Sequence, residues 1–274
     1  MKLILEDSEK AQKWIELFKI LKNLNSYTTI CSQEEKLFIQ IMDDSQVCLM
    51  NVSIEKEWFD EYVSCGETFS ILSTVIVKIF HLYTAGCRLC LETNDEKLNI
   101  RFTYPDKSEK IFELNLIDIE RDMLESQNIE GSVEFEIKTK VFDKYISEMI
   151  LFGENMEFIC VQENIYMKSY GDEGKYTLKL PHNTMDELIV EDDLQLKTKI
   201  SLKYLSYITK GHAVFPQMSV KIQKGVPLQL DILEDNIEIR YYIAPKMSDE
   251  DDEDEDFSEY VETEGYEHLE NKVL

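Results

Sequence analysis

The one pair of cysteines with metal-ligand spacing in this chain is Cys87-Arg-Leu-Cys90. A structural zinc site commonly combines two such pairs, and no second pair follows in the sequence. The residues around the pair predict a strand, in which side chains three positions apart point to opposite faces of a sheet. The two thiolates would therefore not converge on one ion, and we predict no metal site.

Other side chains that could carry catalysis are not arranged as in a known active site. None of the histidines accompanies a serine or cysteine in a nucleophile motif; they are His81, His182, His212 and His268. Gly171 and Gly174 lie close together but lack the lysine and hydroxyl residue of a phosphate-binding loop. Pairs of carboxylates are uninformative among 55 acidic residues. We therefore expect neither enzymatic activity nor a bound cofactor.

The composition predicts a folded protein with an acidic extension. The chain has 274 residues, of which 43% are hydrophobic, so it can form one large domain or two of ordinary size. Its net charge is -26, and residues 247–274 hold 13 acidic residues against one lysine. Such a segment is typical of a disordered tail. The total charge argues against nucleic acid as a partner unless basic residues gather on one surface.

The sequence also indicates the environment of the protein. Its six cysteines lie within apolar runs, which favours a reducing compartment. The first residues, Met1-Lys-Leu-Ile-Leu-Glu, lack the features of a signal peptide. No apolar run reaches the roughly 20 residues that a membrane-spanning helix needs. We expect an intracellular protein without a membrane partner.

The order of predicted elements repeats once along the chain. Two similar endings, Ile100-Arg-Phe-Thr-Tyr-Pro-Asp-Lys107 and Ile239-Arg-Tyr-Tyr-Ile-Ala-Pro-Lys246, indicate one unit built twice. Helical periodicity predicts helices over 8–24, with Ser8 as N-cap, and over 73–83, 141–152 and 202–210. Strands are predicted over 1–6, 27–31, 37–42, 47–54, 61–65, 88–93, 97–104, 133–138, 157–161, 165–169, 175–180, 219–223, 228–233 and 237–243. We expect an α+β fold with two similar domains, 1–116 and 133–246, joined by a connector, 117–132, and followed by a tail, 247–274.

This pattern resembles the proliferating cell nuclear antigen family of DNA sliding clamps across nearly all of residues 1–246. The resemblance rests on four segments in the family's order: Met42-Asp-Asp-Ser-Gln-Val-Cys-Leu49, Leu116-Ile-Asp-Ile119, Gly225-Val-Pro-Leu228 and Arg240-Tyr-Tyr-Ile-Ala-Pro-Lys246. It implies a homotrimeric ring with antiparallel sheets outside and helices around duplex DNA. Such a ring is placed on DNA by a clamp loader and acts as a processivity factor for DNA polymerase and a docking platform for replication and repair proteins.

The resemblance implies that basic side chains on the free faces of the helices contact DNA. In the first helix, for example, lysines lie opposite an apolar stripe that includes Trp14 and Phe18. The candidates on the four helices are Lys13, Lys19, Lys22, Lys78, His81, Lys144, Lys203 and Lys210. Glu16 and Glu148 share these faces, and a lysine on any one solvated helix is ordinary. Lysine contacts with phosphate carry no sequence information, which suits a ring that slides.

The resemblance also implies a pocket for partner peptides between the Met42 loop, the connector and the final strand. Its residues would be Met42, Gln46, Val47, Leu49, Ile129, Pro227, Tyr242, Ala244 and Pro245. Apolar and aromatic side chains in a groove suit a short peptide helix with aromatic anchors. Gln46 replaces the family's usual histidine, and Glu130 stands where the connector usually has proline.

The tail is longer than the acidic end that the family usually has, and it contains Phe257 and Tyr260. We hypothesise that it docks on a partner or folds back over the peptide pocket. Two alternatives stay open at this point: a subunit of a checkpoint-type or accessory heterotrimeric clamp, and a histone-type chaperone that acts through its acidic tail. The resemblance implies a nuclear location, or a cytoplasmic replication site if the protein is encoded by a virus.

Overall fold

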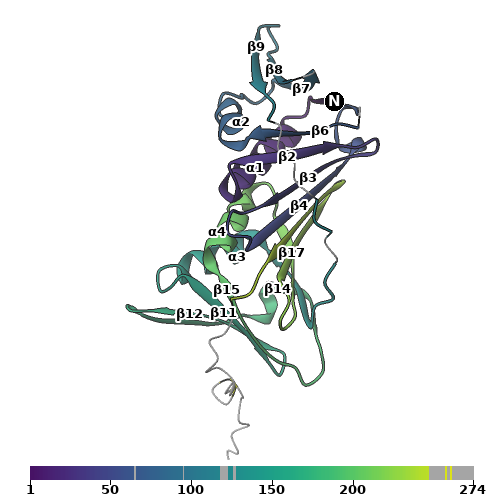
Figure 1. The fold of residues 1–274 in the computed structure, drawn as a ribbon. Helices are drawn as coiled ribbons and strands as arrows, with labels where there is room; N and C mark the ends of the chain where they lie inside the picture. Colours follow the sequence, from purple (N-terminus) through teal and green to yellow (C-terminus); the bar gives the residue numbers. More distant parts are fainter. Residues whose placement is uncertain are drawn as a thin grey trace, which may run out of the picture.

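Figure 1 shows the computed structural model, which describes residues 1–64, 66–94, 96–117, 123–125, 128–246, 257 and 260. The predicted internal repeat is present, because each half contains a strand, a helix, five strands, a second helix and three strands. The fold is α+β, as predicted. Most of the predicted tail, the middle of the connector with Ile119, and Cys65 lie outside the described residues.

The first half comprises β1 (Lys2–Leu5), α1 (Ser8–Leu24), β2 (Tyr27–Ser32), β3 (Lys36–Met42), β4 (Cys48–Glu55), the short 3₁₀ helix η1 (Lys56–Trp58), β5 (Glu61–Val63), β6 (Thr68–Leu72), α2 (Ser73–Phe80), β7 (Arg88–Asn94), β8 (Lys97–Thr103) and β9 (Glu109–Asn115).

The second half comprises β10 (Val133–Lys138), α3 (Thr139–Met149), β11 (Asn155–Val161), β12 (Asn164–Gly171), β13 (Gly174–Lys179), η2 (His182–Thr184), β14 (Met185–Val190), β15 (Gln195–Ser201), α4 (Leu202–Thr209), η3 (Lys210–Ala213), β16 (Gln217–Ile222), β17 (Leu228–Glu234) and β18 (Ile237–Ile243).

A nine-stranded sheet runs through both halves in the order β14-β10-β16-β17-β18-β4-β3-β2-β6. All of its pairings are antiparallel. The halves join where β18 pairs with β4, from Ile237 opposite Ile54 to Ile243 opposite Cys48. Each half adds a smaller sheet of its own, ordered β5-β1-β7-β8-β9 in the first and β13-β12-β11-β15 in the second. The last described strand, β18, therefore pairs with both halves.

The four helices form one layer on one side of the long sheet (Figure 1). Helix α1 packs against α2 and α4, and α3 packs against α4. The apolar stripe of α1 explains this packing, because Trp14, Phe18 and Leu21 are each at most 1% exposed. They belong to one hydrophobic core that also contains Phe142 of α3 and Leu205 of α4. A common core fixes the helices relative to the sheet.

The structure differs from the sequence prediction at several boundaries. Asp7, rather than Ser8, caps α1, because its side chain accepts hydrogen bonds from the N–H groups of Glu9 and Lys10. The Ser8 hydroxyl instead accepts a bond from the Gly86 N–H at 2.8 Å. Helices α2, α3 and α4 end earlier than predicted. Four strands were missing from the prediction: β6, β9, β14 and β15.

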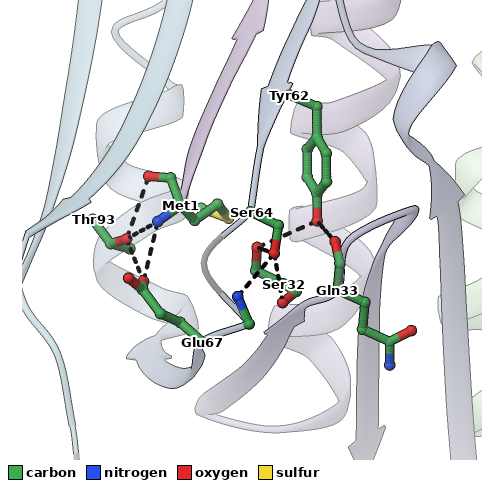
Figure 2. A network of polar contacts seen from close by, with 8 residues as sticks. Met1, Ser32, Gln33, Tyr62, Ser64, Glu67 and Thr93 are labelled. Carbon is green, nitrogen blue, oxygen red and sulfur yellow. Dashed lines mark hydrogen bonds and ion pairs between the residues drawn. The ribbon is translucent and has the colours of Figure 1, made fainter.

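A polar network near the start of the chain ties four strands of the first half together (Figure 2). The amino group of Met1 donates to Thr93 Oγ1 at 2.6 Å and lies 3.1 Å from a carboxylate oxygen of Glu67. Beside it, the Tyr62 hydroxyl donates to the carbonyl oxygen of Gln33 at 2.9 Å, and Ser32 donates to Ser64 at 2.9 Å. The network links β1, β2, β5 and β7, which lie in two different sheets.

Candidate functional site

The loop between β3 and β4 is held by the side chain of Asp43. Its carboxylate accepts hydrogen bonds from the N–H groups of Ser45, Val47 and Cys48 at 3.0, 2.7 and 2.7 Å. It also accepts a 2.6 Å bond from the hydroxyl of Tyr204 on α4, in the other half of the chain. The predicted pocket residues of this loop are therefore fixed by one buried carboxylate that the sequence prediction did not include.

The electrostatics of this pair follow from burial and hydrogen bonding. Burial by itself raises the pKa of Asp43, but the bonds from Tyr204 and from the three backbone N–H groups outweigh it and hold the pKa below its usual value. Burial and the bond to Asp43 raise the pKa of Tyr204 to about 12. Asp43 is thus ionised and Tyr204 protonated at neutral pH, which keeps the bond between the halves intact.

We expect Asp43→Asn to lower the free energy of unfolding by about 1.5–3 kcal/mol at pH 7, because it loses charge-assisted hydrogen bonds. The lowered pKa in the folded state means that the Asp43 contribution is present above the unfolded pKa of about 3.9 and is lost as pH falls through the folded value. The difference from the unchanged protein should therefore shrink in acid. Urea unfolding at pH 7 and in acid measures this difference in the free energy of unfolding. Asp44→Asn, at an exposed position, is the control, and equal effects of the two variants would contradict this role of Asp43.

Several predicted pocket residues meet in one row across the nine-stranded sheet. Met42 lies opposite Leu49, Leu49 opposite Tyr242, and Tyr242 opposite Gln229. Directly paired residues in antiparallel strands point to the same face. The N–H of Ala244 donates to the carbonyl oxygen of Val47 at 2.8 Å, which continues the pairing beyond β18. The structure thus brings the loop and the final strand together on the face away from the helices.

The connector crosses this face and is held by two glutamines. Gln40 Oε1 accepts from the N–H of Leu124 at 2.7 Å, and Gln40 Nε2 donates to the carbonyl oxygen of Leu124 at 2.9 Å. Gln229 Oε1 accepts from the N–H of Ile129 at 2.8 Å. Gln229 is completely buried, and Gln40 is 8% exposed. Both glutamines were missed, because only the structure shows which backbone segment passes over their strands.

A hollow of about 360 Å³ lies between the loop and the connector. Its lining residues are Asn25, Thr29, Gln40, Met42, Asp43, Asp44, Gln46, Met123 and Leu124. Of the predicted pocket residues, Met42 and Gln46 line the hollow itself. Leu49 and Tyr242 continue the same face, and Ile129 lies at its far end. Pro227, Ala244 and Pro245 are partly exposed beyond the row. The hollow is bordered on one side by Met123 and Leu124 of the connector, and Leu49 and Tyr242 lie outside its lining.

The predicted basic residues differ in their surroundings. Lys13 is only 8% exposed, and its ammonium lies 2.5 Å from a carboxylate oxygen of Glu234 in the second half. Lys19 pairs with Glu16 at 2.6 Å, and Lys144 lies 3.9 Å from Glu148. The remaining candidates are exposed on the helical layer or at its ends; they are Lys22, Lys78, His81, Lys203 and Lys210. Lys140 of α3 is also exposed and was not in the prediction.

Among the described residues, no group of three or more histidine, cysteine, aspartate or glutamate side chains could hold a metal ion. Cys87 lies just before β7, rather than in the strand as predicted, and is buried, whereas Cys90 lies in β7 and is half-buried. No described helix is long and apolar enough to cross a membrane.

Comparison with known proteins gives one consistent result. A model of the N-terminal domain of proliferating cell nuclear antigen matches residues 6–125. The chain is 25% identical over 258 residues to a probable DNA polymerase sliding clamp 2 of Paramecium bursaria Chlorella virus 1, covering 90% of this chain and 92% of that protein. It is 24% identical over 240 residues to proliferating cell nuclear antigen 2 of Drosophila melanogaster, covering 84% and 92%. A DNA polymerase sliding clamp of Thermococcus fumicolans is 22% identical over 241 residues, covering 87% and 96%.

Proposed function

This chain belongs to the proliferating cell nuclear antigen family and is a divergent DNA sliding clamp, and we propose that three copies form a ring that encircles duplex DNA. The ring, opened by a clamp loader, would hold a DNA polymerase on its template and offer a docking groove to other replication and repair proteins. It would act in a nucleus or at a viral replication site. Retention of the loaded protein on circular but not linear duplex is its most direct test.

The helical layer is the observation that supports DNA encirclement most strongly. Helices α1, α2, α3 and α4 together carry eight lysines and four acidic residues, a net charge of +4, whereas the whole chain carries -26. Positive charge concentrated on one surface of an acidic protein is what contact with a phosphate backbone requires. The rest of the chain therefore carries a net charge of -30.

Two open sheet edges support a closed ring. Strand β9 ends the small sheet of the first half, and β13 ends that of the second; β9 and the β11–β12 hairpin lie at opposite ends of the molecule (Figure 1). The Leu116 N–H donates to Glu96 beside β8, so alternate residues of β9, including Ile111, direct their backbone groups away from β8. Different edges at the two ends favour head-to-tail contacts, which close into a ring when the rotation allows it.

The groove beside the connector would receive partner peptides. Met42, Leu49 and Tyr242 provide an apolar and aromatic floor, and the connector provides a rim of backbone groups. A short peptide with hydrophobic anchors suits such a groove. The two glutamine contacts would keep the rim in place before the peptide arrives, which lowers the entropy cost of binding.

We expect the double variant Gln40→Ala, Gln229→Ala to bind a clamp-binding peptide about tenfold more weakly, because it loses hydrogen bonds that hold the connector and each contributes about 1 kcal/mol. Limited proteolysis should also cut the connector faster. Fluorescence anisotropy with a labelled peptide measures the affinity. Gln217→Ala is the matched control, since Gln217 bonds to Glu136 and not to the connector. Unchanged peptide affinity in the double variant would mean that the connector is not part of the binding site.

A further inference from the structure

The small sheet β13-β12-β11-β15 has one face in the core and one face outside it. On β11, Met156, Phe158 and Cys160 belong to the main hydrophobic core. The alternate residues Ile159 and Val161 belong to a separate cluster on the opposite face, although each is only 1% exposed. Residues that alternate along a strand point to opposite faces. Something other than the main core must therefore cover the outer face.

The covering residues come from the C-terminal segment. Tyr260 is 8% exposed and packs with Ile159 and Val161, and Phe257 packs against the same cluster. The ring of Tyr260 lies 4.9 Å, centroid to centroid, from that of Tyr166 on β12. The Tyr260 N–H donates to the carbonyl oxygen of Phe257 at 2.9 Å, which closes a turn and brings both aromatic residues to the sheet. The tail is anchored here by an aromatic turn.

The outer face is also rich in lysine. Its register places Lys179 opposite Tyr166, Lys175 opposite Tyr170, and Lys197 opposite Ile159. Lys168 and Lys199 lie opposite Glu157 on the two neighbouring strands. This face therefore carries five lysines and one glutamate within a chain of net charge -26. Lys168 Nζ lies 3.4 Å from the Tyr260 hydroxyl, so the charged and aromatic parts of the face adjoin.

The sequence of the tail complements this face. Eight consecutive acidic residues, 249–256, immediately precede Phe257, and Glu259 and Glu262 flank Tyr260. The segment also starts nearby, because the Lys246 N–H donates to the carbonyl oxygen of Lys199 on β15 at 2.8 Å. A short tether keeps its binding segment at an effective concentration on the order of millimolar. The tail thus combines negative charge with aromatic residues, and the outer face of the sheet combines positive charge with an apolar patch, so the two are complementary.

We propose that the outer face of β11, β12, β13 and β15 is a docking surface for acidic segments with an aromatic anchor, and that the chain's own tail, through Phe257 and Tyr260, is its resident occupant. The described tail residues thus lie on this face and not over the peptide pocket beside the connector, which is where a folded-back tail is hypothesised from the sequence. Any partner that uses the same chemistry must displace the tail. The tail would then restrict this surface to partners that bind more tightly or that arrive tethered nearby.

The test compares the full chain with a chain that lacks residues 247–274, using a labelled peptide of sequence 248–264 as the probe. Fluorescence anisotropy should show binding to the shortened chain and at least about tenfold weaker apparent binding to the full chain, because the tethered segment competes. The peptide with Tyr260→Ala should bind the shortened chain at least about tenfold more weakly. The full chain with Tyr260→Ala should bind the unchanged peptide nearly as well as the shortened chain does.

Charge reversal separates this surface from general attraction of an acidic peptide. In the shortened chain, Lys168→Glu with Lys179→Glu should abolish peptide binding, whereas Lys107→Glu, in an exposed turn of the first half, should leave it unchanged; melting temperatures check that each variant is folded. Equal binding by the full and shortened chains, or no effect of Tyr260→Ala, would overturn the proposal. Preference of the surface for a single-stranded oligonucleotide over the peptide would overturn it as well, since the occupant would then be a nucleic acid.

Discussion

Ile111→Pro is expected to convert the protein from the proposed trimer of about 97 kDa, three times 32.3 kDa, to a monomer. The N–H of Ile111 points away from β8, so proline removes no hydrogen bond within the sheet. It does remove a donor from the edge that a second copy must use and places a ring against the incoming strand. Light scattering coupled to size-exclusion chromatography measures the mass, and Ile111→Thr, which keeps the N–H, should remain trimeric.

Thr177→Pro tests the opposite edge in the same way. The Leu180 N–H donates to Ile165 on β12, so by alternation the backbone groups of Thr177 point away from β12. This variant should also be a monomer. A mixture of the Ile111→Pro and Thr177→Pro chains should form a dimer of one copy of each and nothing larger, because one intact β9 and one intact β13 remain. A mixture that stays monomeric, or single variants that stay trimeric, would contradict head-to-tail pairing through these strands.

Reversing one exposed lysine on each helix should have the second large effect. The variant Lys22→Glu, Lys78→Glu, Lys144→Glu, Lys203→Glu changes the charge of the helical layer from +4 to -4 in every subunit. Because phosphate contacts dominate such interactions, we expect loading on primed DNA to fall at least about hundredfold at moderate salt while the trimer persists. Loading is measured as the amount of labelled protein that is retained on each circular DNA molecule.

The matched control reverses four lysines that lie outside α1, α2, α3 and α4, namely Lys36, Lys56, Lys107 and Lys224. It has the same total charge as the helix variant. Equal loss of loading in both variants would mean that net charge, and not the helical surface, governs contact with DNA. An intact trimer that loads normally despite the four helix reversals would exclude the helices from the DNA-facing surface.

Local patterns were sufficient to predict much of the fold. The apolar stripe of α1 and the repeated order of strands and helices depend on neighbouring residues, and both are present in the structure. Strand β15 was missed although its buried residues Leu196, Thr198 and Ile200 alternate, because the lysines between them and the flanking Gln195 and Ser201 give the stretch a polar composition. The pairing of β4 with β18 could not be predicted, since strand partners far apart in sequence leave no local signal.

In the candidate site, too, the features that depend on residues far apart in the sequence could not be predicted. Met42 and Tyr242 were identified through the resemblance to the family, but Gln40 and Gln229 were not, since their roles depend on a backbone segment that crosses their strands. Lys13 has the helical position of a DNA-facing residue, yet it pairs with Glu234, which lies 221 positions away along the chain. The docking of Tyr260 likewise required knowledge of which sheet face the main core leaves uncovered.

The most direct test of the central claim is retention on DNA of defined topology. The protein is loaded on nicked circular duplex by a clamp loader, isolated by gel filtration in high salt, and followed before and after one cut by a restriction enzyme. A ring that encircles DNA stays with the circle and is lost within minutes of linearisation, because its hold depends on topology more than on contacts. Equal loss from circular and linear DNA, or equal retention on both, would contradict the claim that this chain is a sliding clamp.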